Sequence, residues 1–203
     1  MKKLFMFKNL FIIFVCCILF LGTEETSEGA IIIDQQAPYY DGNPISYKSD
    51  NFYWQQGVTA GNSGKLYSID LFLFTSDVID ITLFSGIPWQ TSSPVFETSF
   101  SPTSGVWNNI DVSSADFMVD VGTQFTIMLH GSDPNTSLAG NSWGYSGGSL
   151  WFVSGSNAPW ENNWDLAFNT YVETSAVPIP AAAFLFGSGL IGLIGIRRRS
   201  NKQ

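Results

Sequence analysis

The sequence predicts an all-β domain, an antiparallel β-sandwich of jelly-roll type, over residues 31–173. Two observations predict it. Apolar and polar residues alternate with a period of two in several short runs, and clusters of Gly, Ser, Asn and Pro separate these runs. Many short strands at this spacing are typical of sandwiches and jelly rolls. Hydrophobic residues make up 45% of the chain, which is enough for a core and excludes a mostly disordered protein.

Three runs carry the clearest alternation, and each places one set of side chains on the inner face of a strand. Residues 65–74, KLYSIDLFLF, place inward Tyr67, Ile69, Leu71 and Leu73. Residues 78–84, VIDITLF, place inward Ile79, Ile81 and Leu83. Residues 123–130 place inward Phe125, Ile127 and Leu129, and outward Gln124, Thr126, Met128 and His130. Further strands are predicted at 94–100, 105–112, 149–153 and 166–172, separated by turns at 61–64, 101–102, 131–135 and 147–148.

The charge is distributed very unevenly along the chain. The whole chain has a net charge of −8, but most of its Lys and Arg residues lie near the two ends. Between residues 31 and 177 only Lys48 and Lys65 oppose fourteen Asp and Glu residues, a net charge of −12. Such a surface repels phosphate backbones, so nucleic acid is excluded as a partner.

The first thirty residues have the layout of a secretory signal peptide. Lys2, Lys3 and Lys8 precede an apolar stretch from 10 to 21, and small and acidic residues follow. We expect cleavage between Gly22 and Ala30; an uncleaved membrane anchor is the alternative, although the stretch is shorter than the ~20 residues of a spanning helix. Both cysteines, Cys16 and Cys17, lie in this stretch, so the mature chain has no disulfide and no thiolate metal site.

The last thirty residues, 174–203, have the pattern of a membrane-spanning tail. No charged residue occurs from 174 to 196, and the apolar part after Pro180 is about 16 residues long, or roughly 24 Å of helix. This length can just span a bilayer when flanking residues extend it. The run ends in Arg197, Arg198 and Arg199, which by the positive-inside rule place the C-terminus in the cytoplasm and the acidic domain outside.

This tail resembles the PEP-CTERM sorting signal of exported bacterial proteins. The matching residues are the proline motif, a Gly-rich apolar helix and the arginine cluster, here Val177, Pro178, Ile179, Pro180, AAAFLFGSGLIGLIGI and Arg197–Arg199. Ile179 stands where the family has Glu. The resemblance implies that a membrane protease of the exosortase type is a partner, that it cuts near the proline motif, and that the product is a cell-surface or extracellular protein. A plain tail anchor is the alternative.

A second resemblance covers most of residues 31–173. The segments TAGNSGKLYSIDLFL, ITLFSG, GTQFTIMLHG and DLAFNTYVE are similar to the lectin-like sandwich domains that often precede such tails. The resemblance implies a sandwich fold, display at the cell surface and contact with glycans. It names no ligand.

The candidate carbohydrate-binding residues are aromatic. All seven tryptophans lie in the predicted domain, and indole rings pack on the C–H faces of sugars while amides bond the hydroxyls. The best clusters are WENNW and NSWGY, which give as candidates Trp143, Tyr145, Trp160, Asn162 and Trp164. The alternative for each ring is a place at the edge of the core, and this is expected most for Trp107 and Trp151, which lie inside strand-like runs.

The enzymatic patterns are weak, and we expect no enzyme. Gly144–Gly148 fits G-x-S-x-G, but it leads into a strand-like run and His130, the single histidine, precedes the serine. Glu97 and Glu161 could in principle form the carboxylate pair of a glycoside hydrolase. Loops at 41–43 and 133–137 carry oxygen ligands that could hold a structural calcium ion, and Asx turns explain them equally well.

Two functions therefore lead. The first is an exported surface or matrix protein that binds extracellular polysaccharide. The second is a structural or adhesive surface protein without a specific glycan site.

Overall fold

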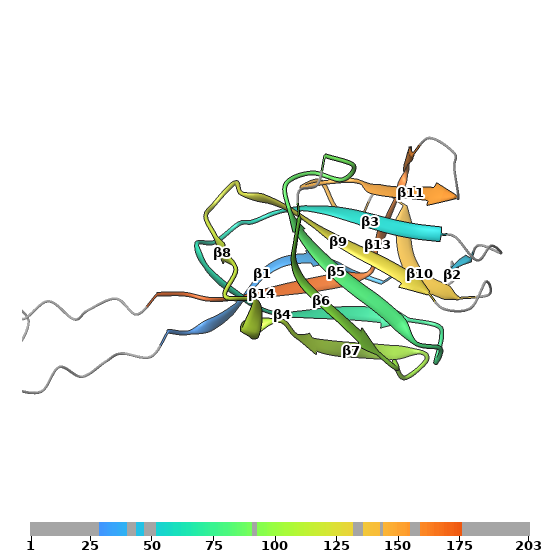
Figure 1. Cartoon of the computed structure of the whole chain (residues 1–203), viewed down its shortest axis with the longest axis horizontal. Helices are drawn as coiled ribbons and strands as arrows, with labels where there is room; N and C mark the ends of the chain where they lie inside the picture. The colour runs from blue at the N-terminus through green and yellow to red at the C-terminus, as the bar shows by residue number, and fades with distance from the viewer. Residues whose placement is uncertain are drawn as a thin grey trace, which may run out of the picture. The chain divides into compact units, whose positions relative to one another are not determined.

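The structure is a computed structural model that describes residues 29–39, 44–46, 52–90, 93–131, 136–142, 144–154 and 159–175. Within these ranges the regular elements are β-strands and one short 3-10 helix, η1 (Ser113–Ala115). The strands form two antiparallel sheets, which confirms the predicted all-β sandwich (Figure 1). Residues Gly29–Ser175 make up one compact unit. In the described part of the chain, no helix has the length and apolar character needed to cross a bilayer.

The first sheet has six strands. Their order across the sheet is β12 (Trp160–Asn162), β11 (Leu150–Ser154), β3 (Phe52–Thr59), β9 (Gln124–Gly131), β5 (Ile79–Ser85) and β6 (Pro94–Phe100). All neighbours in this order are antiparallel. Figure 1 shows β3, β9 and β5 side by side in this layer.

The second sheet has eight strands. Its main path is β1 (Ile31–Ala37), β14 (Phe168–Glu173), β4 (Gly64–Leu73), β10 (Ser137–Ser142) and β13 (Trp164–Leu166). Two further strands pair with β4, namely β7 (Val106–Asp111) and β8 (Met118–Val119), and β2 (Pro44–Ser46) pairs with β10. In Figure 1, β14, β4 and β7 lie in the lower half of the view, where β5 and β6 of the six-stranded sheet cross them.

The core lies between the sheets and is built from the inward residues of the alternating runs. Phe125, Ile127 and Leu129 of β9 are at most 1% exposed, as predicted. The inward set of β5, namely Ile79, Ile81 and Leu83, is equally buried. Full burial of each such side chain contributes about 1.5–3 kcal/mol relative to leaving it in water, so these strands hold the two sheets together.

The predicted inward position of Tyr67 is wrong, and a β-bulge is the reason. Ser68 of β4 pairs with Tyr171 and Leu66 pairs with Val172, so Tyr67 is an extra residue opposite the junction of that pair. An extra residue shifts the alternation by one position. Leu66 is therefore 0% exposed, while Tyr67 is only half-buried; Ile69, Leu71 and Leu73 point inward as predicted.

The bulge gives the first testable prediction. Leu66→Ala should lower the free energy of unfolding by about 2–5 kcal/mol, because it leaves a cavity in a fully buried site. The larger truncation Tyr67→Ala should cost about 1 kcal/mol or less, because its ring lies outside the core. Urea unfolding followed by tryptophan fluorescence measures both. The assigned bulge would be wrong if Tyr67→Ala were the more damaging change.

Candidate functional site

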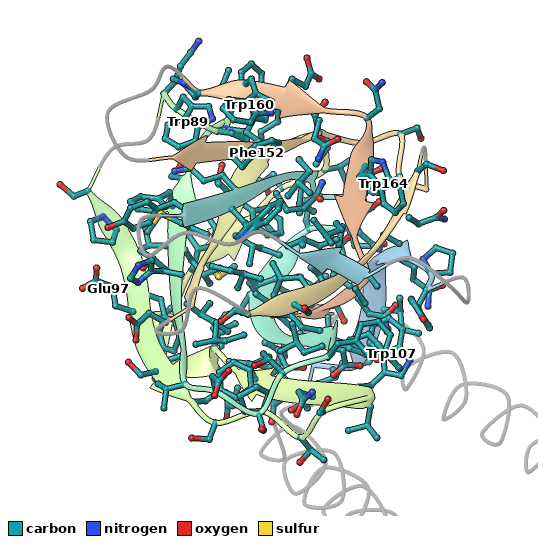
Figure 2. The ribbon with its side chains drawn as sticks, turned by 90° about the vertical axis from the view of Figure 1, so that its right-hand side faces the viewer. Trp89, Glu97, Trp107, Phe152, Trp160 and Trp164 are labelled. Carbon is teal, nitrogen blue, oxygen red and sulfur yellow. The ribbon has the colours of Figure 1, made fainter. Side chains whose placement is uncertain are left out.

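Trp160 lies at the edge of the core. It is opposite Phe152 in the register of β11 and β12, and the two ring centroids are 3.9 Å apart in an edge-on contact. Phe152 in turn packs against Trp54, which is 4% exposed. Trp160 is 43% exposed because β12 is the last strand of its sheet. Figure 2 shows Trp160 above Phe152, so its ring covers the end of the core.

Within the described part of the chain, the other predicted binding residues do not join Trp160 in one open groove. Trp164 belongs to β13 of the other sheet and packs half-buried against the core, well apart from Trp160 in Figure 2. Asn162 pairs with Leu150 and is half-buried. Trp143 lies outside the described residues. So do the residues of the predicted sorting signal and of the predicted calcium loops, namely Val177, Pro178, Ile179, Pro180, Arg197, Arg198, Arg199, 41–43 and 133–135.

Tyr145 is an interior residue and not an exposed sugar platform. It is 9% exposed, and its ring packs edge-on against Phe168 with 5.1 Å between centroids. Its hydroxyl donates to the carbonyl oxygen of Thr59 at 3.2 Å and accepts from the Thr59 N–H at 3.0 Å. Burial raises the pKa of Tyr145 to about 12. Tyr145 therefore anchors the segment before β11 to the end of β3.

A buried carboxylate completes this anchor. Asp165 of β13 is 4% exposed, and its Oδ1 accepts from the side-chain amide of Gln56 at 3.1 Å. Its Oδ2 accepts from the Tyr145 N–H at 3.0 Å. The Gln56 Oε1 accepts from the Leu166 N–H at 2.9 Å. Burial raises the pKa of Asp165, and the hydrogen bond from Gln56 opposes that shift. These contacts link β3 of one sheet to β13 of the other.

The anchored segment forms one wall of a hollow on the outward face of the six-stranded sheet. The hollow has a volume of about 190 Å³. Its polar and aromatic lining comes from Trp151, Glu161 and Gln124, and its backbone lining from Gly57 and Gly147–Ser149. Trp151 and Glu161 are directly opposite each other in β11 and β12. Two glycines make the close approach feasible, because a Cβ on Gly148 would lie 2.1 Å from the Gly57 oxygen.

The opposite wall is the first part of the loop between β5 and β6, residues 86–90. Ile87 and Pro88 line the hollow, and Trp89 follows with a left-handed backbone at φ 63°. A non-glycine residue in that region is held by its surroundings, here by a hydrogen bond from the Trp89 N–H to Gln55 Oε1 at 3.0 Å. The Thr126 hydroxyl donates to the Gly86 oxygen at 2.8 Å. Thr126 thus lies on the outward face as predicted, but this loop buries it.

The expectation that Trp107 is a core-edge residue is wrong. Trp107 is 41% exposed and is paired with Phe72, which lies between the inward residues Leu71 and Leu73 of β4. Both rings therefore occupy the outward phase of their strands. Trp151 likewise faces outward, half-buried, beside Glu161. The signal that could have found these rings is the phase of the alternation, because an aromatic residue in the outward phase is not needed by the core.

The described residues do not form the carboxylate pair of a glycoside hydrolase, a nucleophile elbow or a cluster of metal ligands. Glu97 and Glu161 lie in one cross-strand row, but β6 and β12 are opposite edges of a six-stranded sheet. Five strand spacings of about 4.8 Å separate them by roughly 24 Å, and glycoside hydrolysis needs about 5–9.5 Å. Residues 144–149 lead into β11, not into a helix. In the described ranges, no three His, Cys, Asp or Glu side chains gather as metal ligands.

His130 is a half-buried residue near the end of β9. Its ring stacks on that of Tyr53 with 4.7 Å between centroids, and its Nδ1 is 3.5 Å from Asp80 Oδ2. Ser99 donates to the same carboxylate. These contacts explain the histidine as part of the outward surface of the sheet, where the alternation over residues 123–130 predicted it.

The buried carboxylate gives the second prediction. Because burial raises the pKa of Asp165, the native state keeps this proton at pH values where the unfolded chain has lost it. The contribution of Asp165 to stability therefore falls as pH rises from about 4 through its native pKa. Asp165→Asn should cost about 1–3 kcal/mol, because its NH₂ group faces a donor.

Urea unfolding of both proteins between about pH 3 and pH 6 measures this effect. As pH rises, the free energy of unfolding of the wild type should fall relative to that of Asp165→Asn. The exposed acid Asp120, changed to Asn, controls for the loss of one charge. A difference that grows in favour of the wild type as pH rises would contradict the assigned direction.

Comparison with known proteins gives little beyond this geometry. No family model matches the chain, and no curated protein matches it. Among solved structures, the chain is similar to part of one described as the structure of infectious bursal disease virus Gx strain, with 11% identity and a TM-score of 0.18. The match covers 75% of this chain and 33% of that chain. A likeness of this size carries no argument about fold or function.

Proposed function

We propose that the chain is an exported surface or matrix protein whose sandwich domain binds extracellular polysaccharide. The observation that carries the proposal is the hollow on the six-stranded sheet, where the indole of Trp151 lies opposite the carboxylate of Glu161. This pairing offers an apolar ring surface and a hydrogen-bond acceptor within one small concave site.

The chemistry of the hollow fits a sugar unit. A pyranose presents a face of C–H groups that packs on an indole, and its hydroxyls need both donors and acceptors at the rim. Glu161 supplies acceptors, and Gln124 supplies a donor and an acceptor. A volume of about 190 Å³ suits a single sugar unit, such as the end or a side branch of a chain, better than a long segment.

Export and sorting rest on the two ends of the sequence. The basic and apolar start supports a cleaved signal peptide over 1–30. The proline motif and the arginine cluster support a transmembrane helix that an exosortase-type protease removes, with the C-terminus in the cytoplasm before cleavage. The jelly-roll connection of the strands belongs to the same proposal, since many short strands at this spacing are typical of it.

A structural or adhesive surface protein is the second candidate function. The observation that favours it is the position of three of the predicted glycan-binding rings, since Tyr145 is buried and both Trp160 and Trp164 pack at the core. Such a protein would act through protein contacts and hydration, with no sugar in the hollow.

The sorting proposal predicts the mass of the extracellular protein. In the native host, the intact mass of the extracellular form should correspond to a chain that begins between residues 22 and 31 and ends near residues 177–180. Removal of the leader and of the apolar tail is the physical reason. A form that retains Arg197–Arg199 would instead identify a plain membrane anchor.

The binding proposal predicts a loss on removal of the indole in the hollow. Trp151→Ala should weaken retardation of the extracellular protein in affinity electrophoresis through gels that contain the host's extracellular polysaccharide. The expected change in the dissociation constant is about tenfold, above the ~1 kcal/mol that only a minority of interface residues contribute. Met118→Ala, which removes a side chain of a residue 59% exposed on β8, serves as the matched control.

Trp160→Ala should bind like the wild type, because that ring faces the core edge. Wild-type protein that migrates alike with and without polysaccharide would favour the structural or adhesive function.

A further inference from the structure

We propose that the outward face of the eight-stranded sheet is a second polysaccharide-binding surface, of a different shape, and that the protein therefore cross-links polysaccharide chains. The second surface stands on its own observations. The cross-linking rests in addition on the proposed function of the hollow.

The first observation is a cluster of rings that the core does not use. We call it the aromatic ledge; its members are Tyr39, Phe72, Phe74 and Trp107. Tyr39 stacks on Phe72 with 4.5 Å between centroids and 9° between ring planes. Trp107 meets Phe72 edge-on at 5.5 Å and is 41% exposed. Because each ring is fixed by another ring, the ledge needs little ordering when a ligand binds.

The second observation is a line of polar side chains beside the ledge. We call it the polar row; it runs across β1, β14, β4 and β7 and consists of Gln36, Asn169, Asp70 and Asn109, which are paired in register. The Gln36 amide donates to Asn169 at 3.4 Å, and the Asn109 amide donates to Asp70 Oδ1 at 2.8 Å. The Tyr171 hydroxyl donates to Asp70 Oδ2 at 2.7 Å, which raises the pKa of Tyr171.

These bonds hold the polar row in one arrangement before any ligand arrives. Amide and carboxylate groups retain unused lone pairs after one bond each, and the amides of Gln36 and Asn109 each carry a second N–H. The row can therefore accept from and donate to hydroxyl groups. A sugar hydroxyl does both, so the row matches the edge of a polysaccharide chain.

The spacing of the two features fits an extended chain. The polar row crosses four strands, about 14 Å at a strand spacing of about 4.8 Å. Phe72 and Trp107 lie two residues further along β4 and β7, about 7 Å away on the same face. A polysaccharide that lies across the strands can thus place its ring faces on the ledge and its hydroxyls on the row. The strand spacing is close to the length of one sugar unit.

Charge selects a neutral polysaccharide as the occupant. Asp70 and Asp111 lie on this face, since each is opposite an outward residue of a neighbouring strand. Lys65 is the one Lys or Arg among the described residues, and it lies within 3.8 Å of both Asp116 and Glu173. On the described part of this face, an acidic polysaccharide or an anionic lipid surface would meet carboxylates and no unpaired Lys or Arg. A neutral chain avoids this repulsion and uses the carboxylates as acceptors.

The two surfaces cannot serve one chain segment. The ledge faces outward from the eight-stranded sheet and the hollow faces outward from the six-stranded sheet, with the core between them. In Figure 2, Trp107 lies far from Trp89, and Trp89 belongs to the loop that forms one wall of the hollow. A chain bound on each face is therefore a different chain or a distant part of the same chain, and joining two such chains forms a cross-link.

The test compares binding with cross-linking. The extracellular form of the protein is run through gels with galactomannan, hydroxyethyl cellulose or the host's own polysaccharide, with alginate as the acidic comparison. The same polymers in solution are scored for turbidity or gelation on addition of protein. Wild type should be retarded by at least one neutral polymer and should cross-link it, and alginate should do neither.

Variants of the second surface separate the two proposals. Trp107→Ala and, independently, Asn109→Ala should abolish turbidity while leaving retardation weakened by about tenfold or less. Trp151→Ala should give the same pattern from the other face, and Trp107→Ala with Trp151→Ala should remove retardation. Val121→Ala, at a position 68% exposed in the turn between β8 and β9, is the control.

The outcomes are distinguishable. If Trp107→Ala and Asn109→Ala bind and cross-link like the wild type, the second surface is wrong while the proposed function stands. If Trp151→Ala has no effect but Trp107→Ala removes all retardation, the hollow is wrong, the second surface stands and the cross-linking fails. If wild type is not retarded by any of the polymers, both proposals are wrong.

Discussion

The hydrogen bonds of one buried glutamine fix the corner of the sandwich on which the hollow depends. Gln56 is 0% exposed, and its amide joins β3 to Asp165 and Leu166 of β13 in the other sheet. Asp165 then accepts from the N–H of Tyr145, whose hydroxyl returns to Thr59. Loss of the Gln56 or the Asp165 side chain would leave a buried polar group without a partner, which costs more than the hydrogen bond contributes. This hydrogen-bond network therefore positions the wall at Gly147–Ser149, and the position of the wall determines the shape of the hollow.

The same glutamine shows where sequence reasoning about the fold succeeds and where it stops. The alternating runs predicted β5 and β9 with the correct inward residues, because burial of apolar side chains alone decides those strands. β3 does not show this alternation of apolar and polar residues, because the consecutive residues Gln55 and Gln56 are both buried. Asp165, the hydrogen-bond partner of Gln56, is 109 residues away in the sequence, so no local sequence pattern predicts the contact. The bulge at Tyr67 shifts the phase of β4 for an equally nonlocal reason, the pairing with β14.

The proposed site contains residue types that the sequence analysis named, an aromatic ring beside polar side chains, but at other positions. Aromatic residues with polar neighbours were predicted as the sugar-binding groups, but the position of a tryptophan in a polar loop does not indicate which way its ring points. Trp160 is exposed because its strand is at an edge, and it still covers the core. Trp107 and Trp151 face outward because of their phase in a strand, which can be read only once the inward residues of the same strand are known. The ledge also depends on Tyr39, which meets Phe72 through tertiary structure.

We propose that the two outward faces together hold polysaccharide on both sides of one core. Hydrogen–deuterium exchange of the protein, with and without a neutral polysaccharide, tests this account most directly. We expect slower exchange in two separate segments, residues 106–111 of β7 and residues 147–151 beside the hollow, while the core strand β9 is unchanged. Protection confined to other segments, or an exchange pattern unaffected by bound polysaccharide, would contradict it.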